Sequence, residues 1–153
     1  MKENHLVTKD EMDTIFNPPK QGLTLEEFKD DICLYVKLYD WVSIAELKRR
    51  YGPQAQGEYS LNLPRSPNIL LFAGVSGLFC KALEEVILEK RIHPHSSSYL
   101  VYLIDGEILR LPLAQRMPAA GDYKSPHWLP VTFRYGERCS LKGCPGKRAK
   151  KEP

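Results

Sequence analysis

The stretch of residues 68–92, NILLFAGVSGLFCKALEEVILEKRI, constrains the fold more than any other part of the sequence. Ser66 and the proline after it come directly before this stretch, and a serine followed by proline is typical of a capped helix start. This pattern predicts a short helix that ends at Gly74. Ser76 is then expected to cap a second helix over residues 77–90. The stretch is therefore predicted to form a helix, a tight turn and another helix.

Two capped helices are predicted earlier in the chain. Thr24 and Glu27 have the spacing of a capping box, in which each side chain binds a backbone amide of the first turn. Apolar residues then recur every three or four positions, which predicts an amphipathic helix ending near Asp40. Ser43 begins a second, shorter helix in the same way. Residues 52–66, which follow it, are expected to form a long loop.

A β-hairpin is predicted after these helices. Two runs rich in β-forming residues, 99–104 and 107–111, are joined by Asp105 and Gly106. Both residues of an Asp-Gly pair accept the positive φ of a type I′ turn, so the pair is a strong hairpin signal. The predicted fold class is therefore α+β, with helices followed by a two-stranded β-hairpin.

The predicted domain covers residues 23–113. Residues 1–22 are polar and are expected to form a flexible N-terminal arm. Residues 114–136 are expected to dock as an extended segment through the apolar side chains of HWLPVTFRY. Residues 137–153 are rich in Lys, Arg, Gly and Pro, which predicts a basic disordered tail.

The composition is typical of a soluble globular protein, with 42% hydrophobic and 27% charged residues. No apolar run is long enough to predict a transmembrane helix, so no membrane association is expected. The N-terminal residues lack the apolar core of a signal peptide, and a cytoplasmic location is the resulting expectation.

The order of these elements resembles that of the winged helix-turn-helix superfamily over residues 24–113. The resemblance depends most on AGVSGLFCKAL, in which a small residue and an aliphatic residue flank Gly74. Cys80 and Leu83 occupy the two apolar positions that follow in the superfamily. The resemblance implies a DNA-binding regulator or mobile-element accessory factor whose helix after the turn enters the major groove.

The side chains of that helix give only partial support to base recognition. Ser76 and Lys81 are polar residues near its start and could contact bases. Glu84 and Glu85 follow directly, and carboxylates are repelled by nearby phosphates. Most of the affinity for double-stranded DNA is therefore expected from phosphate contacts by cationic residues elsewhere in the chain.

The basic excess of the chain lies in its C-terminal quarter. Residues 114–153 contain 9 Lys and Arg against 3 Asp and Glu, a net charge of +6, so most phosphate contacts are predicted there. Such an asymmetry suggests a segment that binds polyanions, although a solubilising end is an equally simple interpretation. Besides Ser76 and Lys81, the predicted nucleic-acid contacts are Arg65, Arg91, Lys48, Arg49, Arg138, Lys142, Lys147, Arg148, Lys150 and Lys151.

The alternative hypothesis is a protein–protein interaction module without sequence-specific DNA reading. Leu78 and Leu88 are predicted to lie off the core face of the helix after the turn, where they would suit a partner protein or a second copy of the chain. No arrangement of nucleophile, base and acid is apparent in the sequence, so no enzymatic activity is expected.

No cofactor or metal ion is expected from the sequence. Cys139 and Cys144 in CSLKGC form a single pair, whereas structural zinc usually needs two such pairs or two cysteines with two histidines. His93 and His95 lie far away in sequence and are interpreted as part of a structural turn. Free thiols are the simplest prediction for the cysteine pair, with a disulfide or a metal site as open alternatives.

Overall fold

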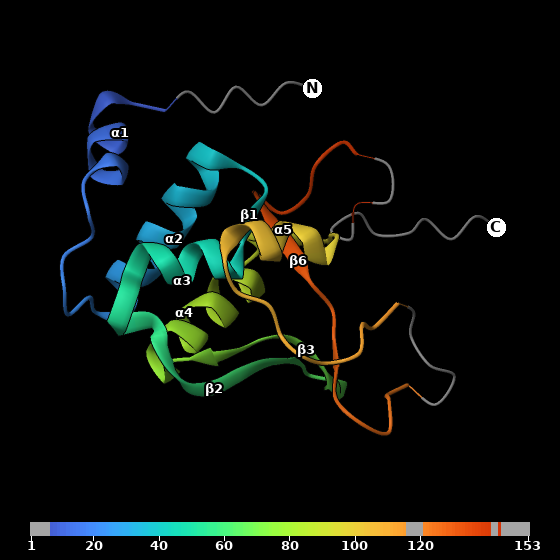
Figure 1. The fold of residues 1–153 in the computed structure, drawn as a ribbon. Coiled ribbons are helices and arrows are strands. Elements are labelled where there is room, and N and C mark those ends of the chain that lie inside the picture. The colour runs from blue at the N-terminus through green and yellow to red at the C-terminus, as the bar shows by residue number, and fades with distance from the viewer. Residues whose placement is uncertain (1–6, 116–120, 142–143, 145–153) are drawn as a thin grey trace.

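The computed structural model describes residues 7–115, 121–141 and 144 of the chain, and it has a mixed α+β fold (Figure 1). The described residues form five α-helices, one 3-10 helix and two three-stranded sheets. In chain order the elements are α1 (Lys9–Phe16), α2 (Leu25–Tyr39), β1 (Val42–Ser43), α3 (Ile44–Tyr51), η1 (Gly52–Ala55), β2 (Gln56–Leu63), β3 (Ser66–Val75), α4 (Gly77–Leu88), β4 (Ile92–Ser96), α5 (Tyr99–Asp105), β5 (His127–Trp128) and β6 (Val131–Tyr135).

The two sheets are small and separate. In the first, β6 lies between β1 and β4 and is antiparallel to both. In the second, β2 and β3 form an antiparallel hairpin, and β5 adds to β3 in parallel. Helix α4 contacts both α2 and the β2–β3 hairpin, which runs along one side of the molecule (Figure 1).

The helix starts follow the sequence signals closely. Thr24 and Glu27 form the predicted reciprocal capping box at the start of α2. Ser43 and Ser76 accept hydrogen bonds from the backbone amides of Glu46 and Phe79, so they cap α3 and α4 as predicted. These caps satisfy amide groups that the first helical turn otherwise leaves unpaired.

Two groups of aromatic side chains fill the core between the helices and the sheets. Phe28, Tyr51 and Phe79 pack together among α2, α3 and α4, with ring centroids 4.7–6.0 Å apart. A second group, consisting of Phe72, Tyr102 and Trp128, joins β3, α5 and β5 with centroids 5.1–6.3 Å apart. All six rings are buried. The second group explains why α5 and β5 stay attached to the hairpin.

The predicted hairpin at residues 99–111 is wrong, because residues 99–105 form helix α5. Ser98 caps this helix, and Gly106 ends it in a left-handed conformation with φ of 99°. Positive φ suits both a type I′ turn and a helix C-terminus, so the Asp-Gly signal was ambiguous. Tyr102 decides the outcome, since α5 buries this ring and its hydroxyl donates to the Val131 carbonyl oxygen.

The short helix predicted before Gly74 is also wrong. Residues 66–75 form strand β3, and most of the predicted loop 52–66 is η1 and the partner strand β2. Short apolar runs fit a buried strand as well as a helix, and only the pairing with β2 and β5 settles the choice. Gly74 does have a positive φ of 74°, but at the end of a strand rather than between two helices. The winged helix-turn-helix arrangement is not confirmed.

The chain on either side of this region is also ordered in part. Residues 9–16, assigned from sequence to a flexible arm, form α1, which buries Ile15. The segment expected to dock in an extended conformation contains β5 and β6. Residues 142–143 and 145–153 of the predicted disordered tail lie outside the described residues. None of the described helices has both the length and the apolar character needed to cross a bilayer.

Candidate metal centre

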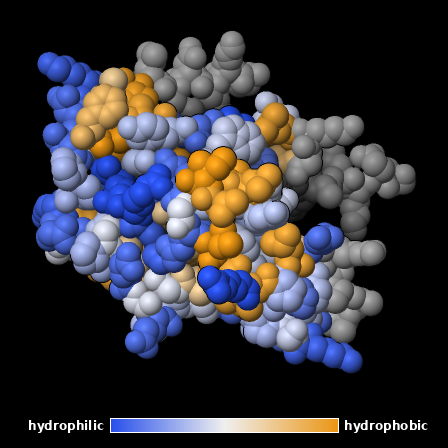
Figure 2. All heavy atoms as spheres, viewed as in Figure 1, coloured by the Kyte–Doolittle hydropathy of each residue, from blue (hydrophilic) through white to orange (hydrophobic). Residues whose placement is uncertain are grey.

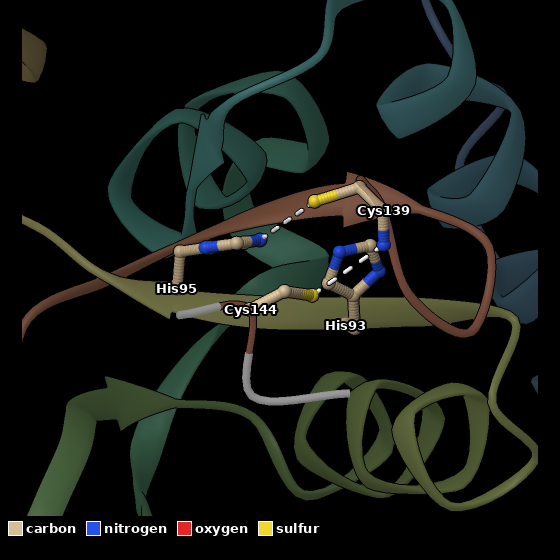
Figure 3. Close-up of side chains that lie close together, drawn as sticks. All are labelled: His93, His95, Cys139 and Cys144. Atoms are coloured by element: carbon tan, nitrogen blue, oxygen red, sulfur yellow. Dashed lines mark hydrogen bonds between the residues drawn. The ribbon is translucent and has the colours of Figure 1, made fainter. Parts of the chain in front are cut away.

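Four potential metal ligands converge at the end of the β1–β6–β4 sheet (Figure 3). His93 and His95 come from β4, and Cys139 and Cys144 come from the segment after β6. One nitrogen or sulfur atom from each residue lies within 4.8 Å of those of the other three. The two pairs are far apart in sequence, since Cys139 lies 44 positions after His95. The fold closes that separation.

Strand β4 places both imidazoles on the same side. Residues two positions apart in a strand project to the same face, so His93 and His95 lie side by side with ring centroids 5.0 Å apart. Pro94 between them lacks a backbone N–H, which is tolerated because β4 is an edge strand that pairs only with β6. The predicted structural turn at His-Pro-His is therefore a strand that presents two imidazoles.

A turn after β6 brings the cysteines back over β4. Gly136 has a φ of 91°, a left-handed conformation that favours glycine, and its amide donates to the Arg91 carbonyl oxygen at 2.7 Å. Beyond this turn, the backbone amide of Cys139 donates to the sulfur of Cys144 at 3.4 Å. Cys144 is buried, whereas Cys139 is partly exposed. The two thiols thus enclose the space next to the imidazoles.

The orientation of His93 is fixed by one of its ring nitrogens. Its Nδ1 lies 2.8 Å from the carbonyl oxygen of Gly136, so Nδ1 carries the proton and donates in a neutral ring. The Nε2 atom then has a free lone pair. That atom is buried and has no hydrogen-bond partner among the residues that the structure describes. A buried imidazole nitrogen without a partner is costly, and a bound metal ion would satisfy it.

The spacing of the ligand atoms is close to that of a tetrahedral zinc site. With Zn–S of about 2.3 Å and Zn–N of about 2.0–2.1 Å, a sulfur and a nitrogen ligand lie about 3.5 Å apart. The Nε2 atom of His95 lies 3.4 Å from the sulfur of Cys139. The ligand atoms that lie farthest apart, within 4.8 Å of each other, must approach by about 1 Å to fit the same tetrahedral geometry.

Three residues surround this cluster and orient its ligands. Asp40 binds the Arg134 guanidinium through two hydrogen bonds of 2.9 and 2.7 Å. These bonds, and then a hydrogen bond to Cys139, raise the pKa of Arg134 above its ordinary value. The Trp41 ring lies under the same guanidinium, and its centroid is 4.5 Å from the central carbon of Arg134. The Trp41 ring also contacts the His95 ring. Arg134 thus places a positive charge beside a sulfur ligand.

The backbone at this contact is strained. Asp40 and Trp41 both have positive φ, 58° and 51°, which is unfavourable for residues with a Cβ. Strain of about 1–3 kcal/mol per residue persists only where the surroundings impose it. Here it turns the Asp40 carboxylate toward Arg134.

The electrostatic surroundings favour neutral imidazole at His95. Burial is the largest cause that lowers the pKa of His95 below its ordinary value, and the neighbouring Arg134 guanidinium lowers it further. Metal ions bind the neutral form of histidine, so this shift favours a ligand over a cation.

The residues predicted to contact nucleic acid are dispersed, and several already have partners. Lys48 is buried and pairs with Glu107 at 2.8 Å. Arg49 hydrogen-bonds the carbonyl oxygen of Asp105, and Arg91 pairs with Asp30 at 2.9 Å. These three cations stabilise contacts between elements of the fold.

The other predicted contacts fall into three groups. Ser76 donates to the Gln54 carbonyl oxygen while it caps α4, so its hydroxyl is engaged. Arg65, Lys81 and Arg138 are exposed at three different places in the fold. Lys142, Lys147, Arg148, Lys150 and Lys151 lie outside the described residues.

Exposed apolar side chains lie at the two positions on α4 that were predicted to contact a partner, and also on α5. Leu78 is 38% exposed and Leu88 is 76% exposed on α4. On the exposed side of α5, which was not predicted from the sequence, hydrophobic side chains form a patch (Figure 2). Its members are Tyr99, Leu100, Leu103, Ile104 and Ile108.

Comparison of the chain with protein-family models, curated proteins and solved structures finds no match in any of the three. The His93, His95, Cys139 and Cys144 cluster is therefore interpreted from its own geometry.

Proposed function

We propose that His93, His95, Cys139 and Cys144 bind one zinc ion in a tetrahedral Cys2His2 site. The observation that carries this proposal is the convergence of four residues whose ligand atoms lie within 4.8 Å of one another, and the buried Nε2 of His93, which has no hydrogen-bond partner in the described chain, supports it. Two thiolates and two imidazoles are a ligand set that zinc prefers in proteins.

The role proposed for this ion is structural. A zinc ion with four protein ligands has no open position for water or substrate, whereas catalytic zinc keeps one. Cys144 and His93 are both buried, which further limits the approach of a substrate. The protein is thus proposed to be a metalloprotein in which zinc stabilises the fold.

The ion would connect two parts of the chain that are distant in sequence. Contacts across the cluster include the hydrogen bond between His93 and Gly136 and the short approach of His95 to Cys139. Zinc would replace the second contact by coordinate bonds and join β4 to residues 139–144. The basic residues 145–153 follow directly, so the ion would attach the start of this segment to the domain.

Metal analysis of the purified protein tests the proposal. Protein prepared without added metal or chelator is expected to contain one zinc ion per chain, measured by mass spectrometry of the elements. His93→Gln and Cys144→Ser each remove a ligand and are expected to lose the zinc. The matched controls His127→Gln and Cys80→Ser change the same residue types outside the cluster and should retain it. Equal zinc content in ligand and control variants would contradict the proposal.

A second candidate function is binding of double-stranded DNA by the C-terminal basic segment. It is favoured by the net charge of +6 over residues 114–153. This proposal does not require α4 to enter a groove, and it relies on phosphate contacts that weaken steeply with salt. Binding to random duplex DNA at increasing salt is the test. Removal of residues 145–153 keeps both cysteine ligands, and it should abolish the binding while zinc is retained.

A further inference from the structure

We propose that the zinc site is redox-sensitive: peroxide converts Cys139 and Cys144 into a disulfide, and the zinc ion is released. This inference rests on the zinc site proposed above and adds its regulation. The two cysteines then have two alternative partners, the metal ion under reducing conditions and each other under oxidising conditions.

The two sulfur atoms are placed for either partner. They lie within 4.8 Å of each other, and a disulfide needs an approach to about 2.05 Å. Only four residues separate the cysteines in sequence, and the amide of Cys139 already donates to the sulfur of Cys144. Ser140 and Leu141, which follow Cys139, are exposed, so this part of the connection has room to adjust.

The surroundings indicate which sulfur reacts first. Cys139 is partly exposed and therefore accessible to a small oxidant, whereas Cys144 is buried. Cys139 is therefore the site of attack, and Cys144 is the resolving thiol.

The reaction is a two-electron oxidation of the thiol pair by hydrogen peroxide. The Cys139 sulfur attacks one peroxide oxygen, the O–O bond breaks, and the leaving hydroxide takes a proton to become water. Cys144 then attacks the sulfenic sulfur, the S–O bond breaks, and the second oxygen leaves as water. Two protons are consumed when both sulfurs start as thiolates. The disulfide no longer supplies two thiolate ligands, and two imidazoles alone do not retain zinc tightly.

The two remaining cysteines are expected to stay reduced under the same conditions. Burial raises the pKa of both Cys33 and Cys80 to about 11, so both are protonated thiols at neutral pH. Protonated thiols react slowly with peroxide. Oxidation should therefore be selective for the zinc ligands.

The test measures zinc and disulfide in the same sample of full-length protein. Zinc content is determined first without oxidant. Hydrogen peroxide is then added, released zinc is followed with a chromogenic chelator, and the protein is alkylated and digested with trypsin. Cleavage after Arg138, Lys142 and Lys147 would place the two cysteines on separate peptides, 139–142 and 143–147.

The expected result is one zinc ion released per disulfide that joins these two peptides, with binding restored after reduction by a dithiol. A Cys33→Ser/Cys80→Ser variant should behave like the wild type. Zinc that stays bound under peroxide, or release without this disulfide, would overturn the redox inference and leave the zinc site intact. Absence of zinc before oxidant is added would instead refute the proposed function, and the redox inference with it.

Discussion

Removal of the zinc ion should destabilise the fold by an amount set by the loop that the ion closes. His95 and Cys139 are 44 residues apart, and the chain-entropy relation for a crosslink over such a loop gives about 4 kcal/mol at 25 °C. A coordinate link is weaker than a covalent one and zinc also binds unfolded thiols, so this value is an upper bound. For a domain of this size it corresponds to a decrease in Tm of roughly 8–16 °C.

Thermal unfolding followed by circular dichroism measures this effect. The wild type is compared with and without a strong chelator, and zinc is then returned in excess to restore the original Tm. His95→Gln should have the low Tm in both conditions. His127→Gln changes a histidine that stacks on Tyr123 outside the cluster, and it should respond to the chelator like the wild type. A wild-type Tm that is the same with and without chelator would refute the reasoning.

Four further predictions concern Asp40, Trp128 and the basic segment. Asp40→Asn weakens the support of Arg134 and should lower zinc affinity about tenfold in a competition titration. Burial raises the pKa of the Asp40 carboxyl group, but the hydrogen bonds and charge of Arg134 lower it by more, so this pKa is lowered overall. The ion pair therefore stabilises the fold above about pH 4. In chelator, the advantage of the wild type over Asp40→Asn should therefore shrink as the pH falls below about 4, and it should vanish below the lowered pKa of Asp40. Trp128→Ala should cost about 3–5 kcal/mol in urea unfolding, because the ring is buried and its Nε1 donates to Leu71. DNA affinity that persists without residues 145–153 would argue against the basic segment as its source.

The capped helices were predictable because their signals are local. Thr24 and Ser76 act on amides three residues away, so the sequence contains both partners of each hydrogen bond. The hairpin prediction failed where the information is not local. The run YLVYLID forms a helix because Tyr102 fits between Phe72 and Trp128, and the latter is 26 residues further along the chain.

The convergence of His93, His95, Cys139 and Cys144 was missed for the same reason. The sequence showed a cysteine pair and a histidine pair, and each was judged alone against the usual zinc spacings. The signal that could have joined them was the alternation of His93 and His95, which places both imidazoles on one face of a strand. The antiparallel pairing of β4 with β6, which brings residues 139–144 beside them, could not be foreseen while residues 99–111 were expected to be the hairpin.

X-ray absorption at the zinc edge of the purified protein tests the central claim most directly. The account predicts a four-coordinate ion with two sulfur neighbours at about 2.3 Å and two nitrogen neighbours at about 2.0–2.1 Å. In the Cys139→Ser variant, the sulfur signal should fall by half or the bound zinc should be lost. A spectrum dominated by oxygen ligands, or one unchanged by that substitution, would contradict the assignment of these four residues as the metal centre.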